Sequence, residues 1–123
     1  MGYRNRVLGK QGEDIAARFL ARKGYKIIAR NVRTFVGELD IVARKKYFIV
    51  FVEVKTRKSK SFGPPYLSIT GKKKKKLIHC ALCYLKMKNM LNMRWRVDVV
   101  SIELDEFSGF AQKIEHFKNA IEK

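Results

Sequence analysis

The chain has 123 residues and a net charge of +17, because 28 Lys and Arg stand against 11 Asp and Glu. Hydrophobic residues make up 46% of the chain, which excludes a disordered polyelectrolyte and predicts a single folded domain over residues 1–123. No apolar run approaches the roughly 18 residues of a membrane-spanning helix, and the polar start of the chain does not resemble a secretory signal.

The first half of the chain predicts one helix followed by three strands. The helix is expected over Lys10–Lys23, where apolar residues recur at helical spacing and Gly24 follows as the C-terminal cap. The three strands are expected over Tyr25–Arg30, Glu38–Ala43 and Ile49–Thr56. The last of these begins with four apolar residues in a row, which is typical of a strand buried on both faces.

The second half predicts a loop, a helix and two more strands. The loop is expected over Arg57–Leu67, and a second helix over Lys72–Met90 is capped by Ser68 or Thr70. Strands are then expected over Arg94–Glu103 and Lys113–Phe117. The order is α-β-β-β-α-β-β, and the second helix can supply a crossover between the third and fourth strands. The predicted fold class is therefore α/β, with a mixed central β-sheet flanked by helices.

Acidic residues and a lysine fall on the two central strands. Side chains alternate along a strand, so Glu53 and Lys55 share one face, as do Glu38 and Asp40. A hairpin with its loop over Lys45–Phe48 pairs Arg44 with Ile49. That register sets Asp40 opposite Glu53, and Glu38 opposite Lys55. Directly opposed β-carbons lie roughly 5 Å apart, so these four side chains are expected to form one cluster.

Such a cluster has the donors that a divalent metal requires. Mg²⁺ prefers oxygen ligands, often one or two carboxylates completed by water and phosphate. Asp40 and Glu53 supply two carboxylates, the Val54 carbonyl supplies a third oxygen, and Lys55 places an ammonium beside them. The alternative is an ordinary Glu–Lys pair on an exposed sheet face. A glutamate within so apolar a strand argues against that alternative, and we expect Mg²⁺ or Mn²⁺ here.

The large positive charge predicts a polyanionic partner, with nucleic acid favoured over an anionic membrane surface. A membrane-surface helix would need a strong moment and a bulky apolar face, which neither predicted helix has. Five consecutive lysines at the start of the second helix are either a solvated helix end or a phosphate contact. The residues predicted to contact nucleic acid are Arg57, Lys58, Lys60, Lys72, Lys73 and Lys76.

Three other residues are expected to be structural. Asp98 lies between apolar residues of a strand, so we expect it to be buried and paired, with an arginine as the partner. Cys80 and Cys83 are expected to be buried or half-buried thiols, because a structural zinc site needs four ligands and only His116 remains beyond these cysteines and the adjacent His79. Free thiols in a small chain without a signal peptide indicate a reducing, cytoplasmic location.

Four stretches of the chain resemble a known family. They are GKQGEDIAA at 9–17, GELDIVA at 37–43, FVEVKTR at 51–57 and VDVV at 97–100. Together they resemble the YraN family of uncharacterised bacterial proteins. That family is similar to the PD-(D/E)XK nuclease superfamily, and in particular to archaeal Holliday-junction resolvases. The resemblance covers roughly residues 9 to 118 and implies a restriction-endonuclease-like fold.

The resemblance assigns roles by position. It implies Asp40 and Glu53 as metal ligands, Lys55 as the catalytic lysine and Glu13 as an assisting acid from the first helix. The proline of the superfamily motif is absent, because Leu39 precedes Asp40. The implied function is a metal-dependent endonuclease that hydrolyses DNA, with branched DNA as the substrate and a homodimer as the assembly of the resolvases. The alternative is a non-catalytic nucleic-acid-binding protein or adaptor that retains the fold.

Overall fold

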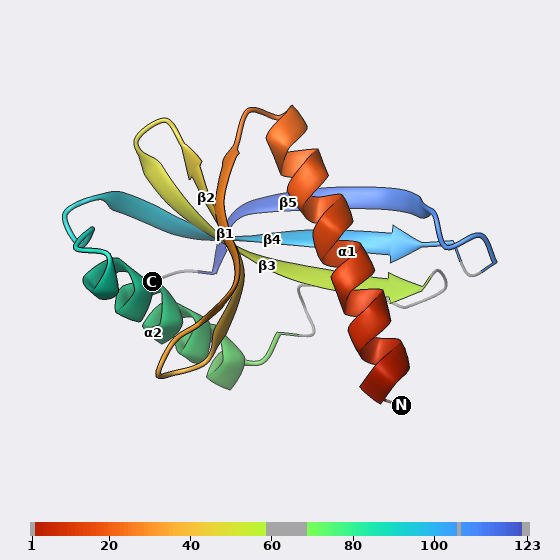
Figure 1. Cartoon of the computed structure of the whole chain (residues 1–123), viewed down its shortest axis with the longest axis horizontal. Helices are drawn as coiled ribbons and strands as arrows, with labels where there is room; N and C mark the ends of the chain where they lie inside the picture. Colours follow the sequence, from red (N-terminus) through yellow and green to blue (C-terminus); the bar gives the residue numbers. More distant parts are fainter. Residues whose placement is uncertain (1, 59–68, 106, 122–123) are drawn as a thin grey trace.

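The computed structural model describes residues 2–58, 69–105 and 107–121, with the side chains of the first helix described from residue 9 onward. One five-stranded sheet in the order β1-β2-β3-β4-β5 forms the centre of the molecule. Helix α1 crosses over one face of this sheet, and α2 lies against the other face near β2 (Figure 1). The arrangement is the predicted α/β fold with a mixed sheet and flanking helices.

The element order α-β-β-β-α-β-β is confirmed. The elements are α1 (Gly2–Arg22), β1 (Lys26–Arg33), β2 (Glu38–Lys45), β3 (Phe48–Lys58), α2 (Gly71–Met87), β4 (Arg94–Leu104) and β5 (Ala111–Ile121). Only β3 and β4 pair in parallel, and the other three ladders are antiparallel. Helix α2 supplies the connection between the two parallel strands, as the sequence predicted. None of the described helices is both long and apolar enough to cross a membrane.

Two apolar layers fill the space between the sheet and its helices. Alternation along β3 sends Ile49 and Phe51 toward α2, and Val50 and Val52 toward α1. On the α2 side, the ring of Phe51 makes edge-to-face contacts with two other aromatic rings. Because β3 is apolar on both faces, it occupies the middle of the sheet, and any polar residue that it carries is drawn toward the interior.

The third strand is longer than the sequence predicted, so the expected loop start at Arg57 is wrong. Parallel pairing with β4 continues through Arg57↔Glu103 and Lys58↔Leu104, and this backbone pairing holds both basic residues in extended conformation. Strand β5 is also longer than expected, because its pairing with β4 extends to Ile121. These extensions depend on a partner strand that is remote in sequence, and a local sequence pattern does not reveal such a partner.

The ends of the helices are set by local chemistry. Gly24 adopts a φ of +89°, the left-handed conformation in which glycine ends a helix most readily. At α2, the hydroxyl of Thr70 accepts a hydrogen bond from the Lys73 backbone N–H at 3.1 Å, so Thr70 is the cap and fixes where the lysine run begins.

A glycine brings α1 close to β3. A β-carbon at Gly12 would stand 1.8 Å from the hydroxyl oxygen of Thr56, so a side chain there is excluded without a shift of the helix. The close approach carries the next residue of the helix, Glu13, toward the centre of the sheet. The packing of α1 on β3 therefore positions one of the predicted site residues.

Candidate active site

The candidate site lies where β2 and β3 diverge. The pairing of these strands runs from Lys45↔Phe48 to Ile41↔Val52, and beyond it β2 pairs only with β1 among the described residues. The pairing of Arg44 with Ile49 confirms the predicted register, although the turn is two residues shorter than expected because Lys45 and Phe48 themselves pair. The divergence leaves an open hollow of about 340 Å³ on the sheet. Its lining residues are Gly9, Glu13, Asp40, Glu53, Val54, Lys55, Thr56 and Lys73.

Where β2 leaves β3, the backbone of β3 loses its hydrogen-bond partner on that side, and the Asp40 carboxylate takes its place. Its Oδ2 accepts a hydrogen bond from the Val54 backbone N–H at 2.9 Å. The N–H and C=O of one residue in a strand point to the same side, so the Val54 carbonyl also faces the gap beside Asp40. The acid thus stabilises the open edge of β3 while holding its carboxylate at the mouth of the hollow.

Glu53 is the buried acid of the site. Its side chain is only 8% exposed. Burial is the main cause that raises the pKa of Glu53 to about 7, and the neighbouring Asp40 carboxylate raises it further. The structure therefore brings the two acids together as the sequence predicted. A pair of carboxylates this close favours a cation or a proton between them.

Two lysines, from different elements, approach this acid pair. Lys55 shares the face of Glu53 on β3. The Lys73 Nζ, from the first turn of α2, lies 3.6 Å from Glu53 Oε1. Burial, and then the neighbouring Lys73, lower the pKa of the Lys55 ammonium. Burial opposes the charge of Lys73, but the attraction of Glu53 and Asp40 and the hydrogen bonds with Lys55 and Glu53 together outweigh it and raise the pKa of Lys73. Lys73 was predicted to contact phosphates, and its ion pair with Glu53 was not foreseen.

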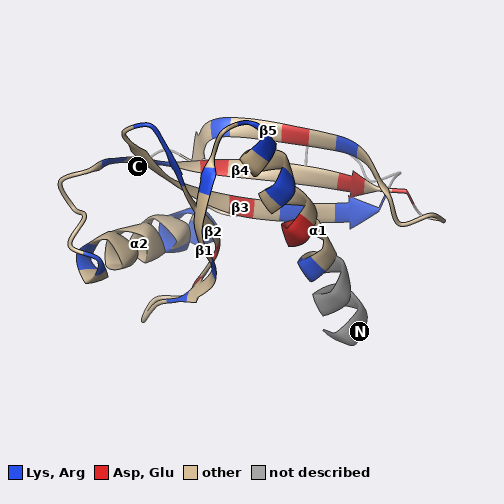
Figure 2. Ribbon diagram, turned by 45° about the horizontal axis from the view of Figure 1, so that its top comes forward, with Lys and Arg blue, Asp and Glu red and all other residues tan. Residues whose placement is uncertain are grey.

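Glu13 reaches the same hollow from α1. Its side chain is 12% exposed and lies 3.5 Å from the guanidinium of Arg30 on β1, which also pairs with Asp14. Burial raises the pKa of Glu13, and the charge of Asp40 adds to the rise. The predicted gathering of Glu13 with the strand residues is thus present, with Arg30 as a partner that the sequence did not indicate. Figure 2 shows the acidic segments on α1 and β3 and the basic start of α2.

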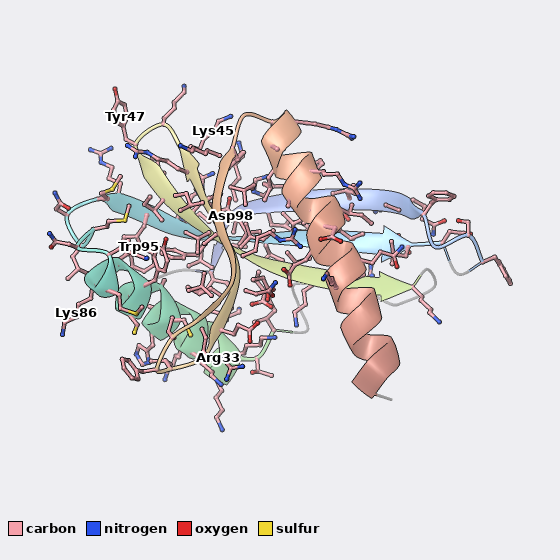
Figure 3. The ribbon with its side chains drawn as sticks, in the orientation of Figure 1. Arg33, Lys45, Tyr47, Lys86, Trp95 and Asp98 are labelled. Carbon is pink, nitrogen blue, oxygen red and sulfur yellow. The ribbon has the colours of Figure 1, made fainter. Side chains whose placement is uncertain are left out.

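Glu38 does not pair with Lys55, so that expectation is wrong. Because β2 has left β3 at this point, Glu38 stands in register with Arg33 of β1, and the two side chains lie 3.7 Å apart. Both are exposed, and Figure 3 shows Arg33 at the end of the sheet next to α2. Glu38 therefore lines a second, outer hollow together with Lys76, and this hollow shares Asp40, Glu53 and Lys73 with the first.

The donors at the hollow suit a hard divalent cation. Within the described part of the chain, no three Asp, Glu, His or Cys side chains gather closely enough to form a metal site by themselves. A cation here would be held by Asp40, Glu53 and the Val54 carbonyl, with water or substrate oxygens completing its shell. Few protein ligands and several exchangeable ones are the usual arrangement for Mg²⁺. The hollow is open enough to admit a phosphate group beside such an ion.

Four of the other predicted nucleic-acid contacts lie on the two elements that border this hollow, at the end of β3 and the start of α2. Arg57 shares the site face of β3 by alternation, and Lys58 follows at the end of the strand. Lys72 is exposed at the start of α2, while Lys76 lies on the site side, where its side chain packs against Gly37. Lys60 lies outside the described residues. Contact of these five basic residues with nucleic acid remains a prediction.

The Glu53 carboxyl gives the site a measurable pH dependence. Its pKa rises from the ordinary 4.5 to about 7 on folding, so between these pH values the folded state binds the proton more tightly than the unfolded state. Ionisation of Glu53 therefore costs stability as pH rises through this window. In chelator, Glu53→Gln should leave stability near pH 4.5 almost unchanged and raise it at pH 8 by about 1–2 kcal/mol.

Urea unfolding of both proteins between pH 4.5 and 9 measures this effect. Glu115→Gln is the matched control, because Glu115 is a partly exposed acid on the neighbouring part of the sheet. The control should show a pH-independent difference close to zero. A Glu53→Gln difference that is equally flat across pH would contradict the raised pKa.

The residues expected to be structural are not part of the first hollow, although Cys80 lines the outer one. Asp98 is fully buried on β4 and pairs with Arg96 at 3.0 Å, which confirms the prediction of a buried acid with an arginine partner. Figure 3 shows it near the middle of the molecule. Cys80 is buried and Cys83 is half-buried, and both are free thiols, as predicted.

Fold and site together define an α/β protein whose mixed sheet carries two carboxylates and a lysine in one open hollow, where a second lysine joins them from α2. The chain belongs to the uncharacterised protein family UPF0102, whose model matches residues 12–102, and the resemblance to the YraN family is thereby confirmed. It is 45% identical to a UPF0102 protein of Geobacter sulfurreducens, over 98% of this chain and 92% of that protein. It is 46% identical to a UPF0102 protein of Geobacter metallireducens, over 99% and 98%. A UPF0102 protein of Caldanaerobacter subterraneus is 37% identical over 94% of each chain.

Proposed function

We propose that this protein is a metal-dependent endonuclease that hydrolyses phosphodiester bonds of DNA. The observation that carries the proposal is the convergence of Asp40, Glu53, Lys55 and Lys73 on one open hollow in a chain of net charge +17. Paired carboxylates next to lysines match what a phosphodiester hydrolase needs: anionic ligands for a cation, and fixed positive charge for the phosphate.

Asp40 and Glu53, with the Val54 carbonyl, would hold Mg²⁺ or Mn²⁺. When bound, the cation supplies positive charge to the scissile phosphate and makes water a better nucleophile. Asp40 is fixed by its hydrogen bond to the Val54 N–H, and Glu53 by its buried position on β3. The ligands are thus held by the central strands and not by a loop, which favours a preorganised site.

Lys55 is the residue that we assign to the chemical step. Burial lowers the pKa of its ammonium, and the adjacent Lys73 lowers it further, so Lys55 gives up a proton more readily than an exposed lysine. In either protonation state it can orient water or stabilise charge on the phosphate. Glu13, held at the rim of the hollow by Arg30, would assist by orienting water.

The surrounding basic residues would hold the DNA backbone. Arg57 and Lys58 extend from the end of β3, and Lys72 and Lys76 from the start of α2, so positive charge borders the hollow on both sides. Phosphate contacts of this kind give affinity without sequence preference. Branched DNA as the substrate and a homodimer as the assembly rest on the family resemblance.

A second function is favoured by one observation. Lys73 already neutralises Glu53 at 3.6 Å, so the acids are compensated without any metal. A protein that binds nucleic acid without cutting it would be stable in this state. Cleavage and binding must therefore be measured together.

The decisive experiment uses end-labelled linear, single-stranded, flapped and four-way DNA with Mg²⁺, Mn²⁺ or chelator. We expect cleavage that requires metal and falls about 100-fold or more in Lys55→Ala. DNA affinity in that variant should change little. Lys86→Ala is the matched control, because Lys86 is exposed at the far end of α2 (Figure 3) and should cut like the unmodified protein.

Three outcomes would reject the proposed metal-dependent nuclease function. Cleavage that survives chelator, or that is equal in both variants, would come from a contaminant or another site. No cleavage on any substrate, together with a DNA affinity that falls steeply with salt, would support the binding protein instead.

A further inference from the structure

Lys73 occupies a position that a simple phosphate contact does not require. It is the third residue of α2, and its side chain turns inward, where its Nζ lies 3.6 Å from Glu53 Oε1. Lys72, Lys74 and Lys75, its neighbours in the same run, are exposed. Lys73 alone of the five-lysine run forms an ion pair within the described residues, and its partner is one of the two acids proposed to hold the metal.

The charges of the two strand acids and the two lysines balance without a metal, and Glu13 at the rim is paired with Arg30. Asp40 and Glu53 carry two negative charges when ionised, and Lys55 and Lys73 carry two positive charges when protonated. A divalent cation added to this set leaves an excess of two positive charges in a partly buried hollow. Repulsion between charges at such distances is large where the dielectric is low. One ammonium must therefore move away from the acids when the cation binds.

Lys73 is better able to move than Lys55. Lys55 lies within β3, and the residues on both sides of it pair with β4, so its backbone is held in the sheet. Lys73 stands in the first turn of α2 on a flexible four-carbon stem, and its side chain is 43% exposed, so space is open beside it. It lines the first hollow and also the outer one, of about 320 Å³, which Asp40 and Glu53 border at one end and in which Glu38 and Lys76 also lie. Rotation about its side-chain bonds can turn the ammonium from Glu53 toward Glu38 without a change in the backbone.

We propose that Lys73 is an internal counter-cation that occupies the acid pair in the metal-free protein and exchanges with the divalent metal. Once displaced from Glu53, its ammonium is available to the phosphate of the substrate. The inference rests on the proposed function and extends it. It assigns Lys73 two successive partners, first the carboxylates and then the phosphodiester, and makes metal binding compete with an ion pair of the protein.

The test is the affinity of the DNA-free protein for Mn²⁺, measured by the decrease of the free-ion paramagnetic resonance signal at pH 8. Lys73→Met keeps an unbranched side chain as far as Cε and removes the charged ammonium. Without the competing ammonium, Mn²⁺ should bind about tenfold more tightly. Lys75→Met is the matched control, because it removes the same charge from the same exposed turn of α2 without touching the acids. Its affinity should stay within about twofold of the unmodified protein.

A second measurement tests whether the displaced Lys73 ammonium acts on the phosphodiester. With Mn²⁺ saturating, Lys73→Met should cut DNA more slowly than Lys75→Met, although it holds the metal more tightly. In chelator at pH 8, urea should unfold Lys73→Met more readily than Lys75→Met, because Glu53 has lost its counter-ion. This unfolding comparison uses neither metal nor substrate.

The outcomes separate the inference from the function on which it rests. Equal Mn²⁺ affinity in Lys73→Met and Lys75→Met, or weaker binding in Lys73→Met, would overturn the exchange while leaving a metal site in place. Absence of Mn²⁺ binding in all three proteins would overturn the metal-dependent function, and the exchange with it. The unfolding comparison would then still decide whether Lys73 is the counter-ion of Glu53.

Discussion

Replacing Asp98 by Ala should destabilise the protein by about 3–5 kcal/mol. Asp98 is completely buried on β4, and its carboxylate is surrounded by donors. Oδ1 accepts hydrogen bonds from Arg96 Nε at 3.0 Å and from the Asn119 backbone N–H at 2.8 Å, and Oδ2 lies 2.7 Å from His116 Nε2. Truncation would leave these groups inside the protein without their acceptor, which is the costliest way to break a buried charge pair.

The partners of Asp98 explain why one residue has so large an effect. Arg96 also donates to the Tyr25 hydroxyl at 2.8 Å, and His116 makes edge-to-face contacts with Tyr25. The carboxylate thus joins β4 to β5 and to the segment that follows α1. Burial by itself would raise the pKa of Asp98, but the hydrogen bonds from His116 and Arg96 outweigh it and lower the pKa below 3.8. Its stabilising contribution is therefore full above pH 3.8 and is lost as pH falls through the lower value.

Urea unfolding at pH 7 measures the loss. The stability of Asp98→Asn should lie between that of the unmodified protein and that of Asp98→Ala, because the amide keeps one acceptor oxygen but loses the charge. Glu115→Ala, on β5, removes an acid whose ion pair with Lys113 is exposed, and it should change stability by less than about 1 kcal/mol. An Asp98→Ala effect as small as that of the control would show that the cluster is not a major source of stability.

The fold was predictable because its signals are local. Strand alternation and one short turn were sufficient to pair Arg44 with Ile49, and that register brings Asp40 to Glu53. An acid between apolar neighbours likewise indicated that Asp98 is buried and paired. Each of these predictions needs only the period of a strand and the cost of burying a charge.

The features that were not predicted depend on packing between remote segments. The divergence of β2 from β3, which sends Glu38 to Arg33, follows from the bending of strands in a twisted sheet. Which of five consecutive lysines faces the acids depends on how α2 is rotated against the sheet, and only the structure identifies Lys73. His116 is the partner of Asp98 because β5 lies next to β4, across 18 residues of sequence.

Replacing Asp40 by Asn should reduce cleavage by about 1,000-fold or more, which corresponds to about 4 kcal/mol in the barrier. The substitution is close to isosteric, and its amide oxygen can still accept the hydrogen bond that the Val54 N–H donates to Asp40. The fold should therefore be kept while one negative charge of the proposed metal site is lost. DNA affinity should be retained or increase, because a negative charge leaves a surface that attracts phosphates.

Glu38→Gln is the control that makes this loss specific. Glu38 precedes Asp40 by two residues on the same strand and lines the outer hollow, but its carboxylate pairs with Arg33 at the surface. Its neutralisation removes the same charge from the same strand, and cleavage should stay within about threefold, as expected for an exposed ion pair. Cleavage that falls equally in both variants would indicate a general electrostatic effect. Metal-dependent cleavage that persists in Asp40→Asn would mean that the cation acts at other residues and not at the acid pair.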